Sequence, residues 1–200
     1  MNDIHLSVIT ATRNRPKHLA RVLQSFREQD HFLNVEHIVV SDGPDEPTKL
    51  LANHYDAVFL HPKEPLGLWG AGAKDMGITA ARGEYVVFWD DDNTYYRNCL
   101  SVLYGISYGF DIGVAQCDLL DLIGGVFRTL PAHWTGSFSY GEIDTMCICV
   151  RRTVAERSKW YDGRSEPGTD FRWLSRIVAS PKSIHFAPVV IGKHPACNGS

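Results

Sequence analysis

The sequence predicts an α/β protein with a doubly wound, mostly parallel sheet, followed by a more irregular C-terminal half. Two observations predict this fold. Short apolar runs alternate with helical patterns through the first 93 residues, and residues 85–89 are apolar throughout. A continuously apolar strand is typical of a parallel sheet that helices cover on both faces. Because no linker or repeat divides the 200 residues, we expect one domain with two halves, about 1–93 and 94–200.

Four strands and three helices are expected to alternate in the first half. The strands are the apolar runs at 6–10, 37–40, 57–60 and 85–89. Pro16 suits the first turn of a helix, and the next apolar residues have the spacing of one helical face: Leu19, Val22, Leu23 and Phe26. Residues 48–55 and 71–81 are expected to form the other two helices. Within the last of these, Ala73, Gly77 and Ala81 have the spacing of a closely packed helix face.

The second half is less regular. We expect strands at 124–128 and 146–150, and helices at 152–159 and 171–178. Residues 184–186 also resemble a strand, in which His185 is expected to be structural. The segment 131–141 is rich in turn formers and aromatic residues, which indicates a functional loop.

Composition excludes several classes of protein. Twenty basic and 23 acidic residues give a net charge of −3, so no basic excess points to a nucleic-acid partner. No apolar run approaches the length of a transmembrane segment, and the first residues do not resemble a signal peptide. An odd number of cysteines, five, indicates reduced thiols in a cytoplasmic protein. Cys147 and Cys149 are expected to be buried structural thiols.

Three consecutive carboxylates, Asp90, Asp91 and Asp92, directly follow the apolar strand at 85–89. In open α/β sheets, ligands bind beyond the carboxyl ends of the strands. Adjacent carboxylates repel one another, and Mg²⁺ or Mn²⁺ would relieve that repulsion while also binding substrate phosphates. The alternative is a solvated acidic turn that caps a helix beginning near Thr94. The position after a central strand favours the metal site.

Four segments in order resemble the family 2 glycosyltransferases of the GT-A fold. They are 8–16 with its Asn14-Arg15-Pro16 turn, 39–43 with Asp42-Gly43, 67–85, and 89–93 with the Asp-x-Asp motif. The resemblance extends from about Leu6 to Pro195. It implies a GT-A-type, Rossmann-like domain in which residues 1–93 bind the nucleotide and 94–200 the acceptor.

The resemblance also implies roles for single residues. Asp42 would bind a uracil base and Asp92 a divalent metal ion. The His of the late His194-Pro195 would be a second metal ligand or would contact the diphosphate. The positions implied in nucleotide-sugar binding are Thr10, Ala11, Thr12, Arg13, Asp42, Lys74, Asp75, Asp90 and Asp91. Four residues depart from those common in the family, which leaves the base and the sugar open: Ala11, Arg13, Ser41 and Asp75.

Asp170 is the candidate catalytic residue. It precedes the helix expected at 171–178 and resembles the Asp of the family's Glu-Asp motif, although Thr169 stands where Glu is common. An acceptor hydroxyl becomes a good nucleophile when a carboxylate takes its proton during attack. The alternative is that Asp170 only stabilises the N-terminus of its helix.

The resemblance therefore implies an inverting glycosyltransferase that uses a UDP-sugar, a saccharide or other hydroxyl acceptor, and Mn²⁺ or Mg²⁺. A sugar-phosphate nucleotidyltransferase is one alternative, but residues 10–14 lack the glycines expected of its phosphate loop. A metal-dependent phosphohydrolase and a non-catalytic sugar-nucleotide binding module are two others. The sequence specifies no oligomeric state.

Overall fold

The computed structural model describes residues 4–30, 33–164, 168–180 and 182–195, and within them nine strands form one sheet. The strand order is β3-β2-β1-β4-β8-β6-β9-β5, with β7 paired to β6. The strands are β1 (Leu6–Thr12), β2 (Val35–Ser41), β3 (Val58–Leu60), β4 (Tyr85–Phe88), β5 (Thr94–Tyr95), β6 (Ile112–Leu120), β7 (Val126–Leu130), β8 (Ile148–Arg151) and β9 (Ile184–His194). The helices are α1 (Pro16–Arg27), α2 (Glu46–His54), α3 (Ala71–Ala80), α4 (Cys99–Ser107), α5 (Arg152–Ala155) and α6 (Thr169–Ile177), with 3₁₀ turns η1 (Leu68–Gly70) and η2 (Thr145–Cys147).

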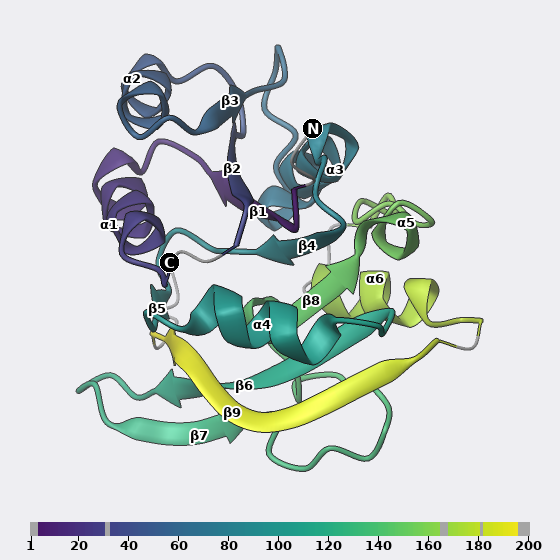
Figure 1. Ribbon diagram of the computed structural model, residues 1–200. Helices are drawn as coiled ribbons and strands as arrows, with labels where there is room; N and C mark the ends of the chain where they lie inside the picture. Colours follow the sequence, from purple (N-terminus) through teal and green to yellow (C-terminus); the bar gives the residue numbers. More distant parts are fainter. Residues whose placement is uncertain (1–3, 31–32, 165–167, 181, 196–200) are drawn as a thin grey trace.

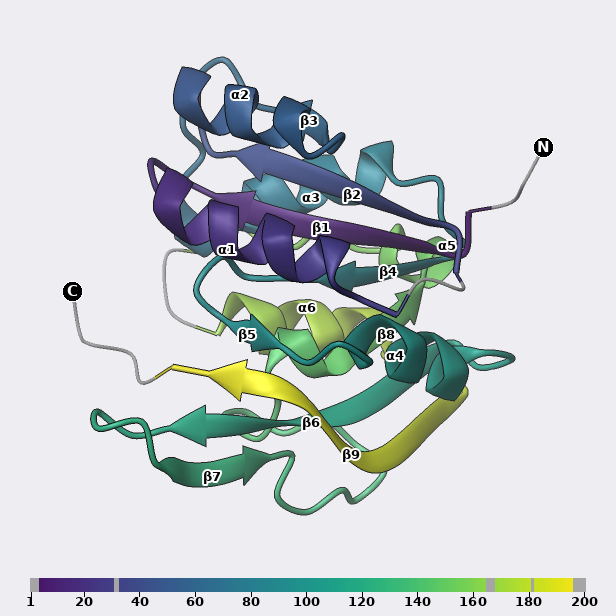
Figure 2. The same ribbon diagram turned by 60° about the vertical axis from the view of Figure 1, so that its left-hand side comes forward.

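The N-terminal half is a doubly wound parallel sheet. Strands β3, β2, β1 and β4 are all parallel neighbours. Helices α1 and α2 lie on one face of this sheet and α3 on the other (Figures 1 and 2). Alternate residues of β2 accordingly enter two hydrophobic clusters: Val39 packs with α1 and α2, whereas Ile38 and Val40 join the main core. The predicted fold class is confirmed in this half.

Helix α3 packs unusually close to the sheet. A Cβ atom added at Gly77 would overlap the side chain of Ile9 on β1, so this position accepts only glycine without a shift of the helix. Ala73 is fully buried on the same helix. The small residues of α3 therefore serve packing, as their spacing predicts, and the close contact holds α3 against β1.

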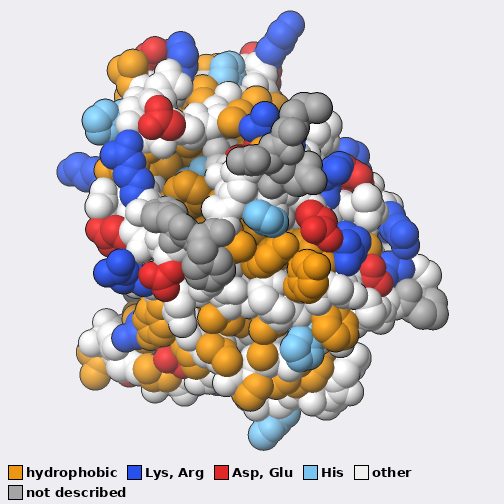
Figure 3. Space-filling view, viewed as in Figure 1, with side chains coloured by type: hydrophobic (Ala, Val, Ile, Leu, Met, Phe, Trp, Pro, Cys, Tyr) orange, Lys and Arg blue, Asp and Glu red, His pale blue; other side chains and the backbone are white. Residues whose placement is uncertain are grey.

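The C-terminal half continues the sheet in mixed directions. Strand β8 pairs antiparallel with β4, β6 pairs antiparallel with β8, and β9 runs parallel to β6. Helix α4 packs on β6 and β9. On the face seen in Figure 3, hydrophobic side chains gather in the lower half, where α4 and β9 lie.

The structure corrects the expected helix near Thr94. Residues 94 and 95 instead form β5, which pairs with Gly192 and Lys193 of β9, and the helix begins only at Cys99. The reason is tertiary packing: the Tyr95 ring stacks on the buried Trp89 at 3.9 Å, and its hydroxyl donates to the Asp90 carbonyl. These contacts fold the chain back on itself after the acidic triplet.

Several other boundaries differ from the sequence prediction. The helix expected at 152–159 ends at Ala155, and residues 145–147 form a 3₁₀ turn before β8. The sequence pattern does not predict strand β6, and β9 extends far beyond the expected 184–186. The loop at 131–141 does lack helix and strand.

The buried cysteines are structural, as expected. Cys99, Cys117, Cys147 and Cys149 are free and fully buried in the main hydrophobic core, while Cys197 lies outside the described residues. His185 is also structural: its Nδ1 lies 2.9 Å from the Ile106 carbonyl oxygen.

Within the described ranges, no helix combines the length and the apolar character needed to cross a bilayer.

His37 on β2 is a buried histidine whose pKa affects stability. Its Nε2 lies 2.9 Å from the Thr10 hydroxyl, and its ring packs against Phe26 at 4.5 Å. Burial lowers the pKa of His37 from 6.5 to about 3. The folded protein therefore holds this side chain neutral at any pH between those values, while the unfolded chain protonates it.

We expect the free energy of unfolding to fall as the pH drops below 6.5, by up to about 1.4 kcal/mol per pH unit from His37 alone. The unfolded state takes up a proton in this window and the folded state does not, so the contribution is complete above pH 6.5. Urea unfolding at pH 7.5 and 5.5 measures it. His37→Phe should flatten the dependence, whereas His54→Gln, at an exposed position, should preserve it. Equal slopes in both variants would contradict this assignment.

Candidate active site

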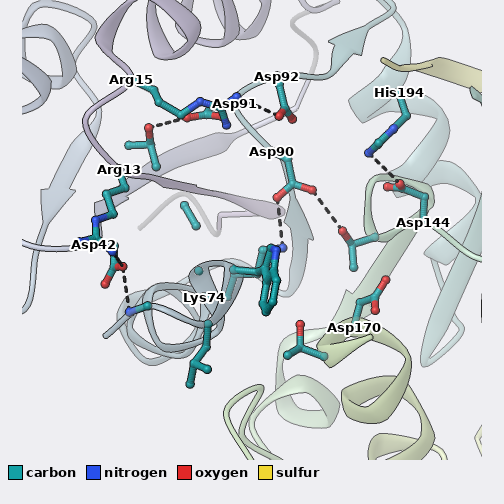
Figure 4. Close-up of a pocket in the computed structure, with 18 of the residues that line it drawn as sticks. Arg13, Arg15, Asp42, Lys74, Asp90, Asp91, Asp92, Asp144, Asp170 and His194 are labelled. Atoms are coloured by element: carbon teal, nitrogen blue, oxygen red, sulfur yellow. Dashed lines mark hydrogen bonds and ion pairs between the residues drawn. The ribbon is translucent and has the colours of Figure 1, made fainter. Parts of the chain in front are cut away.

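A cavity of about 510 Å³ opens at the carboxyl ends of the parallel strands (Figure 4). Its walls come from the ends of β1, β2 and β4, from the loop that precedes α3, and from the C-terminal half. The charged residues that line it are Arg13, Arg15, Asp42, Lys74, Asp90, Asp91, Asp92, Asp144 and Asp170, with His194 beside them. Most residues predicted from separate parts of the sequence thus meet in one place.

The middle carboxylate of the acidic triplet points into the protein. Asp91 is 3% exposed and accepts a 2.6 Å hydrogen bond from the Thr12 hydroxyl and a 2.7 Å bond from Arg15 Nη1. Burial raises the pKa of Asp91, against the opposing effects of Thr12 and Arg15. Arg15 also reaches Asp92 at 3.1 Å. Asp91 therefore ties the turn after β4 to the end of β1 and the start of α1.

Asp90 faces the cavity and pairs with Lys74 from the first turn of α3. The Lys74 ammonium lies 3.1 Å from Asp90 Oδ1 and 4.7 Å from the centre of the Trp160 ring. Thr145 donates a long 3.5 Å hydrogen bond to the other oxygen. Although burial opposes ionisation, Lys74 holds the pKa of Asp90 below its usual value. The pair gives this part of the cavity one fixed cation and one fixed anion.

At the opposite wall, Asp42 fixes the loop that follows β3. Its two carboxylate oxygens accept hydrogen bonds from the backbone amides of Leu66 and Gly67, at 2.6 and 2.9 Å. The Arg13 guanidinium, on the other side, lies 3.6 Å from Asp42 Oδ2. Asp42 therefore lines the cavity and also holds the neighbouring loop in place.

The C-terminal half supplies the remaining wall. Asp170 lies in the first turn of α6, where its carboxylate accepts from the Phe171 amide at 2.8 Å. His194, at the end of β9, has its Nε2 3.7 Å from Asp144. Burial raises the pKa of Asp144, as do Asp90 and Asp170 nearby, while His194 opposes the shift. Because β5 pairs with β9, His194 is brought beside the turn that carries Asp92 (Figure 4).

Two of the predicted nucleotide-sugar ligands lie away from the cavity. Thr10 is fully buried on β1, where its hydroxyl faces His37. Asp75 turns toward the C-terminal half and accepts hydrogen bonds from the Trp160 and Tyr161 amides at 2.8 and 3.2 Å. Burial raises the pKa of Asp75 against these bonds. In this structure both residues support the cavity walls and do not line them, which corrects their predicted placement.

Several residues of the cavity were not predicted from the sequence. Arg15 lies inside the Asn-Arg-Pro turn, and its charge next to an acidic triplet was a signal that could have been used. Asp144 and Thr145 belong to no motif, and only the tertiary fold brings them to the cavity. Trp69 lies within the segment 67–85 that resembles the family, but no role follows from that resemblance for it.

The donor set for a metal ion is partial. No three His, Cys, Asp or Glu residues among those described form a ready cluster that could hold a metal. Asp92 presents a carboxylate that is 36% exposed, and His194 presents an imidazole nearby in the same cavity. Mg²⁺ and Mn²⁺ accept such oxygen and nitrogen ligands and are commonly completed by substrate phosphates and water. Asp92 and His194 are thus of the right chemical type to take part in such a site, while His194 Nε2 faces Asp144 in this structure.

The fold and the acidic cavity define an α/β protein whose cavity lies at the carboxyl edge of its sheet, where open α/β sheets bind their ligands. The sequence profile described as Glycosyl transferase family 2 matches residues 7–123, more than half of the chain. The chain therefore belongs to glycosyl transferase family 2, which confirms the family, and with it the class of enzyme, inferred from the four sequence segments.

Known proteins agree with this assignment. Glycosyltransferase AglE of Haloferax volcanii is 26% identical over 213 residues, which cover 96% of this chain and 67% of AglE. The crystal structure of S. aureus TarS 1-349 in complex with UDP has a TM-score of 0.79 at 16% identity, with 96% of this chain and 61% of TarS covered. Mannosyltransferase PcManGT from Pyrobaculum calidifontis, in complex with GDP-Man and Mn²⁺, has a TM-score of 0.70 at 18% identity, with 97% and 58% covered. These likenesses confirm the GT-A fold, and the chain spans about three fifths of both solved structures.

Asp91 and Asp92 should differ sharply in their effect on stability. Asp91→Ala leaves a buried hydroxyl and Arg15 without their shared partner, so we expect a loss of about 2–3 kcal/mol in the free energy of unfolding. Asp92→Ala removes a partly exposed side chain and should change stability by less than about 0.5 kcal/mol. Urea denaturation of the two variants measures the difference. Similar losses in both would show that Asp91 has no special structural role.

Proposed function

We propose that this chain transfers a sugar from a UDP-sugar to an acceptor hydroxyl, with inversion and with Mn²⁺ or Mg²⁺ as cofactor. The observation that carries the proposal is the meeting of Asp90 and Asp92 with Asp170 in one cavity, although they are far apart in the sequence. Family membership supports sugar transfer. The UDP bound to TarS, which has the same fold, supports the choice of nucleotide.

The donor would lie along the parallel half of the cavity. Arg13 and Asp42 would contact the nucleoside at the ends of β1 and β2, with Ala11 and Thr12 forming the floor between them. Lys74 and Asp90, which form a 3.1 Å ion pair, would contact the ribose or the donor sugar. A fixed ion pair offers both a donor and an acceptor of hydrogen bonds, which suits the hydroxyl groups of a sugar.

Charge balance supports a metal ion. The described residues that line the cavity include six aspartates but only three Arg and Lys side chains, so acidic side chains are in excess. A diphosphate adds further negative charge, so its binding there needs a cation in addition to Arg13, Arg15 and Lys74. Asp92 and His194 would hold that ion. A divalent ion bound there would stabilise the negative charge that develops on the leaving diphosphate.

Asp170 would act as the general base. The acceptor oxygen attacks the anomeric carbon, its proton passes to the Asp170 carboxylate, and the bond from the anomeric carbon to the diphosphate oxygen breaks with its electron pair. Asp170 lies on α6 across the cavity from Asp92, with Asp90 between them (Figure 4). Attack from the side opposite the diphosphate inverts the configuration at the anomeric carbon.

Asp92→Ala tests the metal site. We expect wild-type protein to bind UDP at least about tenfold more tightly with Mn²⁺ than with EDTA, because the ion offsets the carboxylates around the diphosphate. The variant should bind UDP at the weak EDTA level under both conditions. Isothermal calorimetry gives the affinities, and Asp56→Asn, at a side chain that is 95% exposed, is the matched control. Equal wild-type affinity with Mn²⁺ and EDTA would remove the metal from the proposal.

Asp170→Asn tests the base. A thermal-shift screen of UDP-, GDP- and dTDP-sugars with Mn²⁺ first identifies the donor, and UDP release then identifies an accepted hydroxyl compound. The variant should bind the donor as the wild type does, yet transfer should fall about 10²- to 10⁴-fold because the proton has no acceptor. An unaltered transfer rate would leave Asp170 with only its helix-terminal role.

A further inference from the structure

The loop between β3 and α3 holds an unusual backbone. Four consecutive residues have positive φ angles: Gly67 at 67°, Leu68 at 59°, Trp69 at 52° and Gly70 at 74°. Glycine adopts this left-handed region freely, whereas for a bulky residue such as Leu or Trp it is strained. Trp69, with ψ at 37°, occupies the left-handed helical well itself. A conformation of this kind persists only where the surrounding structure enforces it.

The side chain of Trp69 is also unusually exposed. Its exposed fraction is 69%, although it lines the main cavity, whereas Trp89, Trp160 and Trp173 are each 1% exposed or less. An indole that contributes to folding is normally buried, because burial of its large apolar surface is the source of its stabilising effect. The strain and the exposure together indicate that Trp69 is held for a ligand and not for the core.

Both ends of the loop are fixed against the nucleotide-binding strands. Asp42, at the end of β2, accepts the amides of Leu66 and Gly67, which holds the start of the loop. At the other end, a Cβ atom added at Gly70 would lie 3.0 Å from the Cβ of Ala11 on β1. Trp69 is therefore carried at the side of the cavity that Asp42 and Arg13 form, and Asp170 comes from the opposite half.

We propose that the indole of Trp69 stacks on the nucleobase of the donor nucleotide. This inference rests on the proposed function and specifies one residue of its binding site. A base presents a flat π face and a polar edge. Trp69 would contact the face, and Asp42 and Arg13, 3.6 Å apart, would contact the edge. Stacking on an aromatic ring tolerates any base, so Trp69 supplies affinity while the polar pair supplies the choice between bases.

Trp69→Ala and Trp69→Phe test the contact. We expect UDP affinity with Mn²⁺ to fall about tenfold in Trp69→Ala and to be largely kept in Trp69→Phe, which retains a ring. Inorganic pyrophosphate with Mn²⁺ has no base, so its affinity should be equal in all three proteins. UDP should also quench the tryptophan emission of the wild type and not that of Trp69→Phe, since the indole that would meet the base is then absent.

Two further variants separate ligand binding from folding. Trp69→Gly should leave the Tm unchanged or raise it, because glycine adopts the same backbone conformation without strain, yet it should bind UDP as weakly as Trp69→Ala. Tyr108→Ala removes an aromatic ring of similar exposure, 67%, outside the residues that line the cavity. It should leave UDP affinity unchanged.

The outcomes distinguish this inference from the proposed function. Wild-type protein that binds neither UDP nor GDP would overturn the proposed function and this inference with it. Wild-type binding of UDP with equal affinity in Trp69→Ala would overturn the stacking contact alone. A loss seen only with the UDP-sugar, and not with UDP, would place the indole against the sugar and overturn its assignment to the base.

Discussion

The buried carboxylate of Asp91 is the contact on which the cavity depends. Three adjacent carboxylates repel one another, and in this structure their side chains point in different directions. Asp91 turns inward and is neutralised by Arg15 and Thr12, which belong to the start of α1 and the end of β1. Its neighbours are thereby held on the cavity side: Asp90 against Lys74, and Asp92 within reach of Arg15. The contacts of the buried Asp91 carboxylate thus set the positions of the two neighbouring carboxylates on the cavity side.

Acidic side chains also have a structural role at the other walls of the cavity, where they accept hydrogen bonds from backbone amides. Asp42 holds the loop before α3 through two amides, and Asp75 holds residues 160 and 161 in the same way. Carboxylates accept such bonds strongly because they are charged and have two oxygens. The acidic character of this region is therefore partly structural. The ligand-facing charge is smaller than the number of aspartates suggests, and arises mainly from Asp90, Asp92, Asp144 and Asp170.

Local sequence patterns predict the N-terminal half well and the C-terminal half poorly, for a physical reason. Strand β4 is apolar throughout because helices and neighbouring strands cover it, and α1 has a complete apolar face. Strand β6 instead carries Gln116 and Asp118, and β9 carries Pro188 and Gly192, so neither has the pattern of a regular strand. Strand β6 is stabilised by pairing with β9, β8 and β7, and β9 by pairing with β6 and β5. The helix expected near Thr94 fails for the same reason, since the stack of Tyr95 on Trp89 overrides local preference.

The residues of the cavity likewise fall into those that local sequence patterns predict and those that only the tertiary fold places. Residues at the ends of predicted strands, such as Asp42 and Asp90, reach the cavity because the carboxyl ends of parallel strands share one edge. Thr10 does not, since its place on β1 is inside the sheet against His37, where only the strand pairing with β2 could reveal it. Asp144 and Thr145 precede β8 without any motif, and reach the cavity because β8 runs antiparallel to β4 and so begins where β4 ends. Residues that end the predicted parallel strands can thus be placed from sequence order, whereas Asp144 and Thr145 are placed only by sheet topology.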